Sequence, residues 1–154
     1  MVTYERATVV DAPLDTVWAF HADPAGLEAV TPEWLGLTVE SVDRPADSSE
    51  AALPAGTVIT IRVTPFGILP ASRWRSHITA SEYSTGQAMF RDESDTPGID
   101  RWVHTHRFES VSTGTLIHDR VEVEASIPGL SLVLPRLLAP LFALRHRRAH
   151  QVFD

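Results

Sequence analysis

Hydrophobic and polar residues alternate along most of the chain, a pattern that is typical of half-buried β-strands. The segment 3–10 alternates in this way and is rich in β-branched residues, so it is predicted to be a strand. Six further segments show strand patterning: 37–42, 57–65, 73–82, 87–93, 99–109 and 115–125. Turn signals that contain glycine separate most of them. Consecutive strands joined by short turns indicate an antiparallel meander.

Helical spacing replaces the alternation near the two ends of the chain. Asp11 is predicted to cap a first helix, because an early proline and an acidic first turn follow it. The stripe of this helix comprises Leu14, Val17, Trp18 and His21. Pro24 then begins a short second helix that runs through Val30. The tail, 130–153, is predicted to be a long helix, in which Pro140 is expected to cause a kink or a break.

The predicted order of elements, β-α-α-β6-α, belongs to the α+β class. A meander of this size must bury one face, and the final helix is the only element long enough to cover it. A strongly curved sheet around one helix leaves a hollow, so we expect an internal hydrophobic cavity on the order of a few hundred Å³. The stretch 45–50 is predicted to be a long surface loop, so residues 1–154 are expected to form a single domain.

Composition narrows the range of functions. The chain has 154 residues and a net charge of −7, which argues against binding to the nucleic-acid backbone. It contains no cysteine, which excludes disulfides, thiolate catalysis and cysteine-ligated metal sites. Gly-rich phosphate loops, Gly-x-Ser-x-Gly elbows and His-Glu-x-x-His motifs are absent from the sequence. Because no signal-peptide pattern and no apolar run of ~18 residues is present, the protein is expected to be cytoplasmic.

The segment 101–108 carries the clearest candidate chemistry. Strand periodicity places four of its side chains on one face: Trp102, His104, His106 and Phe108. The opposite face, which includes Val103, suits solvent better. On the next strand, Asp119 shares an otherwise apolar face, and a buried carboxylate requires a partner. His104 or His106 is the nearest candidate, and pairing is expected to raise the histidine pKa and to lower that of Asp119.

Three interpretations of this cluster stay open. It could be a His–Asp pair that fixes the register of the strands, a polar anchor for a ligand, or a general acid/base. In the last case, the candidate catalytic residues are His104, His106 and Asp119. The same three residues also have the composition of a two-His, one-carboxylate metal set.

A second cluster lies on the segment 73–78. Its apolar set is expected to face inward, because burying unpaired arginines would cost more: Trp74, Ser76 and Ile78. Arg73 and Arg75 then face solvent. On the following strand, the pattern does not choose between two inward sets: Phe90 with Asp92, or Met89 with Arg91 and Glu93.

Several blocks carry a family resemblance: 11–20 (DAPLDTVWAF), Leu27 with 31–34 (TPEW), 101–108 (RWVHTHRF), Gly114-Thr115 and 119–121 (DRV). Through them the chain resembles the START/Bet v 1-like (SRPBCC) superfamily, which has the helix-grip fold. The late blocks resemble a bacterial and archaeal subgroup of ligand-binding SRPBCC proteins, some of them labelled cell-division inhibitor-like. The resemblance covers essentially the whole chain. In the tail, however, 143–148 (ALRHRR) departs from the aromatic–Arg pair that the family leads us to expect there.

The resemblance implies a cavity that holds lipids, polyketides or other apolar molecules, in carriers and in enzymes such as polyketide cyclases. We therefore expect a carrier or sensor that binds an apolar or aromatic small molecule, such as a lipid, polyketide or isoprenoid-like compound. A cyclase- or dehydratase-like enzyme with a His–Asp acid/base is the alternative. A further alternative is a membrane- or cell-division-associated protein that docks through Arg145, Arg147 and Arg148.

No metal and no cofactor is expected, and the oligomeric state is left open. The expected ligand-binding residues are Trp18, Trp34, Phe66, Trp74, Phe90, Trp102, His104, His106, Phe108, Asp119, Leu138 and Phe142. Most of the aromatic residues among them are also natural core residues. Trp34 and Phe66 stand beside loop signals, so they are expected at the rim of the cavity mouth.

Overall fold

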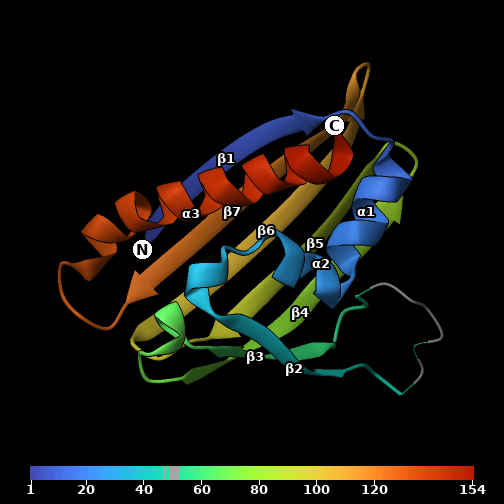
Figure 1. The fold of residues 1–154 in the computed structure, drawn as a ribbon. Helices are drawn as coiled ribbons and strands as arrows, with labels where there is room; N and C mark the ends of the chain where they lie inside the picture. The colour runs from blue at the N-terminus through green and yellow to red at the C-terminus, as the bar shows by residue number, and fades with distance from the viewer. Residues whose placement is uncertain (47, 49–52) are drawn as a thin grey trace.

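Seven antiparallel strands form one curved sheet, and a long C-terminal helix lies across it in the computed structural model (Figure 1). The structure describes residues 1–46, 48 and 53–154. The strands are β1 (Val2–Val10), β2 (Leu37–Asp43), β3 (Val58–Val63), β4 (Ser72–Ser84), β5 (Gln87–Asp95), β6 (Ile99–Val111) and β7 (Gly114–Ala125). Their order in the sheet is β1-β7-β6-β5-β4-β3-β2. The predicted loop at 45–50 falls partly outside the described residues.

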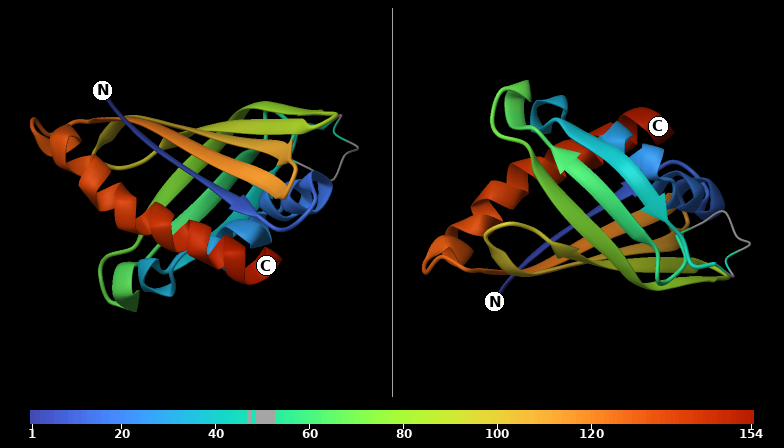
Figure 2. Two further views of the ribbon diagram at one scale, coloured as in Figure 1. Left: turned by 90° about the horizontal axis from the view of Figure 1, so that it is seen from above. Right: turned by 90° about the horizontal axis from the view of Figure 1, so that it is seen from below.

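Three helices cover one side of the sheet, as the views from above and below show (Figure 2). They are α1 (Leu14–Ala22), α2 (Pro24–Val30) and α3 (Leu130–Phe153). The described residues also contain two 3-10 turns: η1 (Glu33–Leu35) and η2 (Pro65–Gly67). This confirms the predicted α+β helix-grip architecture and its order of elements.

The structure contradicts the predicted cap of the first helix, and it excludes the break, one of the two effects expected of Pro140. Pro13, not Asp11, occupies the capping position of α1, and no side-chain hydrogen bond caps the helix there. Pro140 does not break α3, which runs through it without interruption. Proline removes the hydrogen bond to the carbonyl four residues earlier. Because Arg136 and Pro140 are both exposed, water can solvate that carbonyl, so the helix continues.

The buried apolar residues fall into two clusters that meet along β7. One lies against α1 and contains Val17, Trp18, Phe90, Phe108 and Ile117. The other lies under the first half of α3 and contains Val121, Val123, Leu134, Leu138 and Phe142. Asp119 stands between Ile117 of the first cluster and Val121 of the second on the same face of β7. The polar site is therefore built at the junction of the two clusters.

The strand register brings the polar residues of the site together. Asp92 on β5 is paired with His104 on β6, and His106 is paired with Asp119 on β7. The predicted inward face of β6 is confirmed for His104, His106 and Phe108, which are buried. Val103 departs from the prediction that its face suits solvent, since it is fully buried. Its cross-strand neighbours Glu93 and Glu122 flank it, and their aliphatic stems can cover a valine.

Among the described residues, no helix combines the length and the apolar character that crossing a membrane requires.

Candidate functional site

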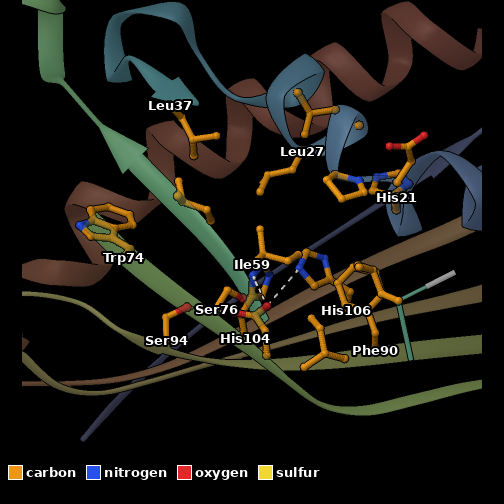
Figure 3. Close-up of a pocket in the computed structure, with 18 of the residues that line it drawn as sticks. His21, Leu27, Leu37, Ile59, Trp74, Ser76, Phe90, Ser94, His104 and His106 are labelled. Carbon is orange, nitrogen blue, oxygen red and sulfur yellow. Dashed lines mark hydrogen bonds and ion pairs between the residues drawn. The ribbon is translucent and has the colours of Figure 1, made fainter. Parts of the chain in front are cut away.

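A pocket lies between the sheet, the two short helices and the second half of α3, with a volume of about 110 Å³ (Figure 3). Apolar side chains form most of its surface, among them Leu27, Leu37, Ile59, Ile61, Trp74 and Phe90. Its polar groups include Asp92, His104, His106 and Arg145. The enclosed space is smaller than the few hundred Å³ that the curvature of the sheet led us to expect. An apolar pocket with a few converging polar groups nevertheless has the composition of a small-molecule site.

Asp119 lies behind the two histidine rings of β6 and holds them in place. His104 Nε2 hydrogen-bonds its Oδ1 at 2.9 Å, and His146 Nε2 hydrogen-bonds its Oδ2 at 2.5 Å. His106 Nδ1 is also 2.8 Å from Oδ1, but its N–H direction does not meet hydrogen-bond geometry. All four side chains are buried, with at most 7% of each exposed. A single carboxylate therefore positions three imidazole rings.

The charge state of this cluster follows from burial and from these contacts. Burial favours the neutral form of Asp119, but the nearby His106 and the hydrogen bonds from the histidines outweigh it and hold the pKa well below its usual value. The carboxylate is therefore ionised, as predicted, and it accepts hydrogen bonds that His104 and His146 donate. The prediction that pairing raises the histidine pKa is wrong for His106. Burial, together with repulsion from His104, lowers its pKa to about 3, so the ring is neutral at pH 7.

Asp92 lies on the opposite side of the two rings and belongs to the pocket wall. Its Oδ2 is 3.8 Å from His104 Nδ1 and 3.9 Å from His106 Nε2. Ser94 donates a hydrogen bond of 3.3 Å to its Oδ1. Burial raises the pKa of Asp92 above its ordinary value, because these contacts stabilise the charge less than water does. The structure thus settles the inward set of β5, which contains Phe90 and Asp92.

His21 contributes a further polar group to the pocket, from α1. Its Nδ1 lies 2.8 Å from the carbonyl of Val17, one turn earlier in the helix. Burial lowers the pKa of His21 to about 4, so this ring is also neutral at pH 7. Neither His21 nor His106 therefore adds a positive charge to the pocket at pH 7.

The basic segment near the end of α3 is used largely inside the molecule. Arg145 lines the pocket, with its guanidinium 5.3 Å from the centre of the Phe142 ring. Burial lowers the Arg145 pKa, while Asp119 and Asp92 oppose this effect, and an arginine stays charged throughout. Arg148 donates a 2.7 Å hydrogen bond to the carbonyl of Thr31 at the end of α2. Although the tail departs from the expected aromatic–Arg pair, Arg145 thus places an arginine at the pocket, beside the ring of Phe142.

The structure distributes the predicted ligand-binding residues among three environments. Those that line the pocket are Trp74, Phe90, Trp102, His104 and His106. Those that lie in the surrounding core are Trp18, Phe108, Asp119, Leu138 and Phe142. Trp34 and Phe66 stack on each other, with ring centres 5.8 Å apart, and are 44% and 64% exposed. Neither of the two residues is among those that line the pocket.

Sequence reasoning missed two members of the polar cluster, Asp92 and His146. The alternation along β5 did not decide which face Asp92 takes, because both faces mix apolar and charged residues. The sequence prediction gave His146 no role of its own, although it continues the spacing of Leu134, Leu138 and Phe142 at every fourth residue. This helical repeat was the signal that could have placed it inside.

The comparisons with known proteins agree with this architecture. The model of the family described as "Domain of unknown function (DUF8410)" matches residues 8–153. The chain belongs to this family. No curated protein matches it. The DUF8410 match covers the end of β1, both short helices, strands β2 to β7 and α3, so the pocket and the polar cluster both lie within the matched residues.

Solved structures show how widely the same fold occurs. Protein CV1439 from Chromobacterium violaceum superposes with a TM-score of 0.71 at 15% identity, over 99% of this chain and 98% of that one. A START superfamily protein from Mycobacterium smegmatis gives 0.63 at 10% identity, over 98% and 96%. The di-domain ARO/CYC StfQ from the steffimycin biosynthetic pathway gives 0.68 at 13% identity, over 97% of this chain and 50% of that one. This DUF8410 chain therefore has the START-like SRPBCC fold.

Proposed function

We propose that the protein is a carrier or sensor that binds an apolar or aromatic small molecule in the pocket. The observation that supports this most is the combination of a mostly apolar pocket surface with a few polar side chains. Leu37, Ile59 and Trp74 would bury the apolar body of the ligand. His106 and Arg145 would face its polar end and fix its orientation.

The volume of the pocket sets an upper limit on the size of the ligand group that it can enclose. A cavity of about 150 Å³ lined by aliphatic and aromatic residues can hold one benzene molecule. The 110 Å³ present here thus corresponds to roughly one ring or a short branched chain. Burying the 150–250 Å² surface of a ring of aromatic side-chain size contributes about 4–6 kcal/mol before the entropic cost of binding. A larger ligand would extend through the open side of the pocket.

This proposal can be tested with a variant that fills the pocket. Native mass spectrometry of protein from its own host would identify a ligand that co-purifies, and titration would then follow quenching of Trp74 and Trp102. Ile59→Phe adds bulk to the pocket wall and is expected to weaken binding by at least about tenfold. Ile127→Phe, at a position that is 59% exposed, is the matched control and should bind like the wild type. Equal affinity of both variants would contradict binding in this pocket.

A second candidate function is acid/base catalysis of the cyclase or dehydratase type. The observation in its favour is that His106 lines the pocket while Asp119 lies behind its ring, which resembles a base held by an orienting carboxylate. One structural neighbour carries the ARO/CYC name. The pKa of His106, about 3, makes it a weak base, so we rank this function below carriage. Turnover of a polyketide-type substrate that disappears in His106→Gln would reverse this ranking.

A further inference from the structure

Three potential metal ligands converge on the polar wall of the pocket. They are Asp92 of β5 and His104 and His106 of β6, all of them buried. One donor atom from each lies within 4.8 Å of the other two. Asp92 Oδ2 is 3.8 Å from His104 Nδ1 and 3.9 Å from His106 Nε2. All three side chains line the pocket, so the space in front of them is open to a small molecule (Figure 3).

On the side away from Asp92, the rings of His104 and His106 contact Asp119. His104 Nε2 donates to Asp119 Oδ1, and His106 Nδ1 is 2.8 Å from the same oxygen. A proton on His104 Nε2, which the hydrogen bond to Asp119 favours, leaves a lone pair on Nδ1, and a proton on His106 Nδ1 would leave one on Nε2; these two nitrogens are the ones nearest Asp92. A carboxylate behind histidine ligands is the usual outer support of a metal site. His146, bonded to the other oxygen of Asp119, fixes that support in turn.

We propose that Asp92, His104 and His106 form a binding site for one divalent transition-metal ion. Two imidazole nitrogens and one carboxylate oxygen suit Zn²⁺, Fe²⁺ or Co²⁺ better than Mg²⁺ or Ca²⁺, which prefer oxygen ligands. Metal–nitrogen bonds of about 2.0–2.1 Å require the donor atoms to approach by less than about 1 Å, which small side-chain rotations supply. The remaining coordination positions face the pocket. Asp119, which the sequence suggested as the carboxylate ligand, belongs behind the rings instead.

The charges around the site are compatible with a cation. Asp92 and Asp119 carry two carboxylates on this wall, and Arg145 supplies one fixed positive charge. A divalent ion would stabilise the ionised form of Asp92, which has no cationic side chain within hydrogen-bond distance among the described residues. Arg145 would then be free to attract an anionic group of a molecule bound at the open positions.

The test is a titration of the full chain with Co²⁺ after removal of metals by a chelator. We expect one Co²⁺ per chain, a visible absorption band of nitrogen-coordinated Co²⁺, and displacement by Zn²⁺. Asp92→Asn should weaken binding by at least about tenfold. Asp95→Asn makes the same change at an 80% exposed position of the same strand and should bind like the wild type. His146→Asn, which loosens Asp119, should weaken binding by about 10–100-fold and alter the absorption band.

Two results would overturn the proposal. One is the absence of stoichiometric binding to the wild-type chain, a result that needs no variant to fold. The other is binding that Asp92→Asn leaves unchanged, which would place the ion at exposed histidines such as His77. The chelator-treated protein can be tested for apolar ligands in parallel, so this site and the proposed carrier function can fail separately.

Discussion

Asp119 and Asp92 face the same two histidines from opposite sides, and their environments differ sharply. Asp119 lies among three imidazole rings, and its pKa is well below the usual value. Asp92 has only long contacts to the same rings, and its pKa is raised. Burial is nearly the same for both, at 3% and 8% exposed. The two carboxylates thus differ in their hydrogen bonds rather than in their burial. Asp119 is fixed by the histidines, whereas Asp92 is available to a ligand.

The largest expected change in stability comes from replacing Asp119, and the same replacement of Asp92 provides the comparison. Asp119→Asn removes the negative charge and replaces one of the two oxygens that accept from His104 and His146 with an NH2 group, so one buried N–H group loses its acceptor and faces another donor. We expect a loss of about 3–5 kcal/mol in the free energy of unfolding, measured by urea denaturation. Asp92→Asn, the matched change on the other side, should alter it by less than about 1 kcal/mol. Similar losses for both variants would show that the two carboxylates play the same structural role.

Lowering the pH is expected to decrease the free energy of unfolding, because two buried histidines resist protonation in the folded protein. The unfolded chain protonates His106 near pH 6.5, but the folded protein does so only near pH 3. The unfolded state therefore binds more protons in this window, and stability falls as the pH drops through it. His21, with its pKa lowered to about 4, acts in the same direction. Urea unfolding at pH 7.5, 6 and 4.5 should show a decline on the order of a few kcal/mol.

His106→Phe provides the control for this pH dependence. Phenylalanine preserves the stacking against Phe90 but cannot take up a proton. The variant should lose stability less steeply between pH 6.5 and 4.5, whatever its stability at neutral pH. A slope equal to that of the wild type would mean that His106 is not the group that resists protonation.

The smallest expected change in stability concerns α3, the helix on which His146 lies. Arg148→Ala removes the hydrogen bond to the carbonyl of Thr31 and should cost about 1 kcal/mol of unfolding free energy. Arg147→Ala, at an exposed neighbouring position, should change it by less than about 0.5 kcal/mol. Thermal melts of the two variants give the comparison. If Arg147→Ala costs as much, the contact to Thr31 is not what holds α3 in place.

The fold was predictable from the sequence because its signals are local and repeated. The alternation along β6 and β7 gave the inward positions of His104, His106 and Asp119, since a period of two leaves only two choices. The same rule did not resolve β5, where Asp92 competes with charged residues of the other parity. Periodicity predicts a face only where one face is clearly more apolar.

The remaining features of the site depend on distances that a sequence does not contain. The lowered pKa of His106 reflects how completely its surroundings exclude water, and pairing alone had suggested the opposite shift. The mutual stacking of Trp34 and Phe66 joins two turns that are far apart in the chain. His146 reaches Asp119 across 27 positions, so its role becomes visible only once α3 lies on the sheet.

The position of Asp119 between the two apolar clusters also has a consequence for the cooperativity of unfolding. Ile117 and Val121 belong to separate apolar clusters, and the polar cluster fills the seam between them. A ligand in the pocket would contact residues of the first cluster, such as Ile59 and Phe90, together with the histidines of the polar cluster. The polar side chains that contact the ligand would then be the same ones that join the first cluster to the second, so ligand binding and cooperative unfolding of the two clusters would depend on one set of residues.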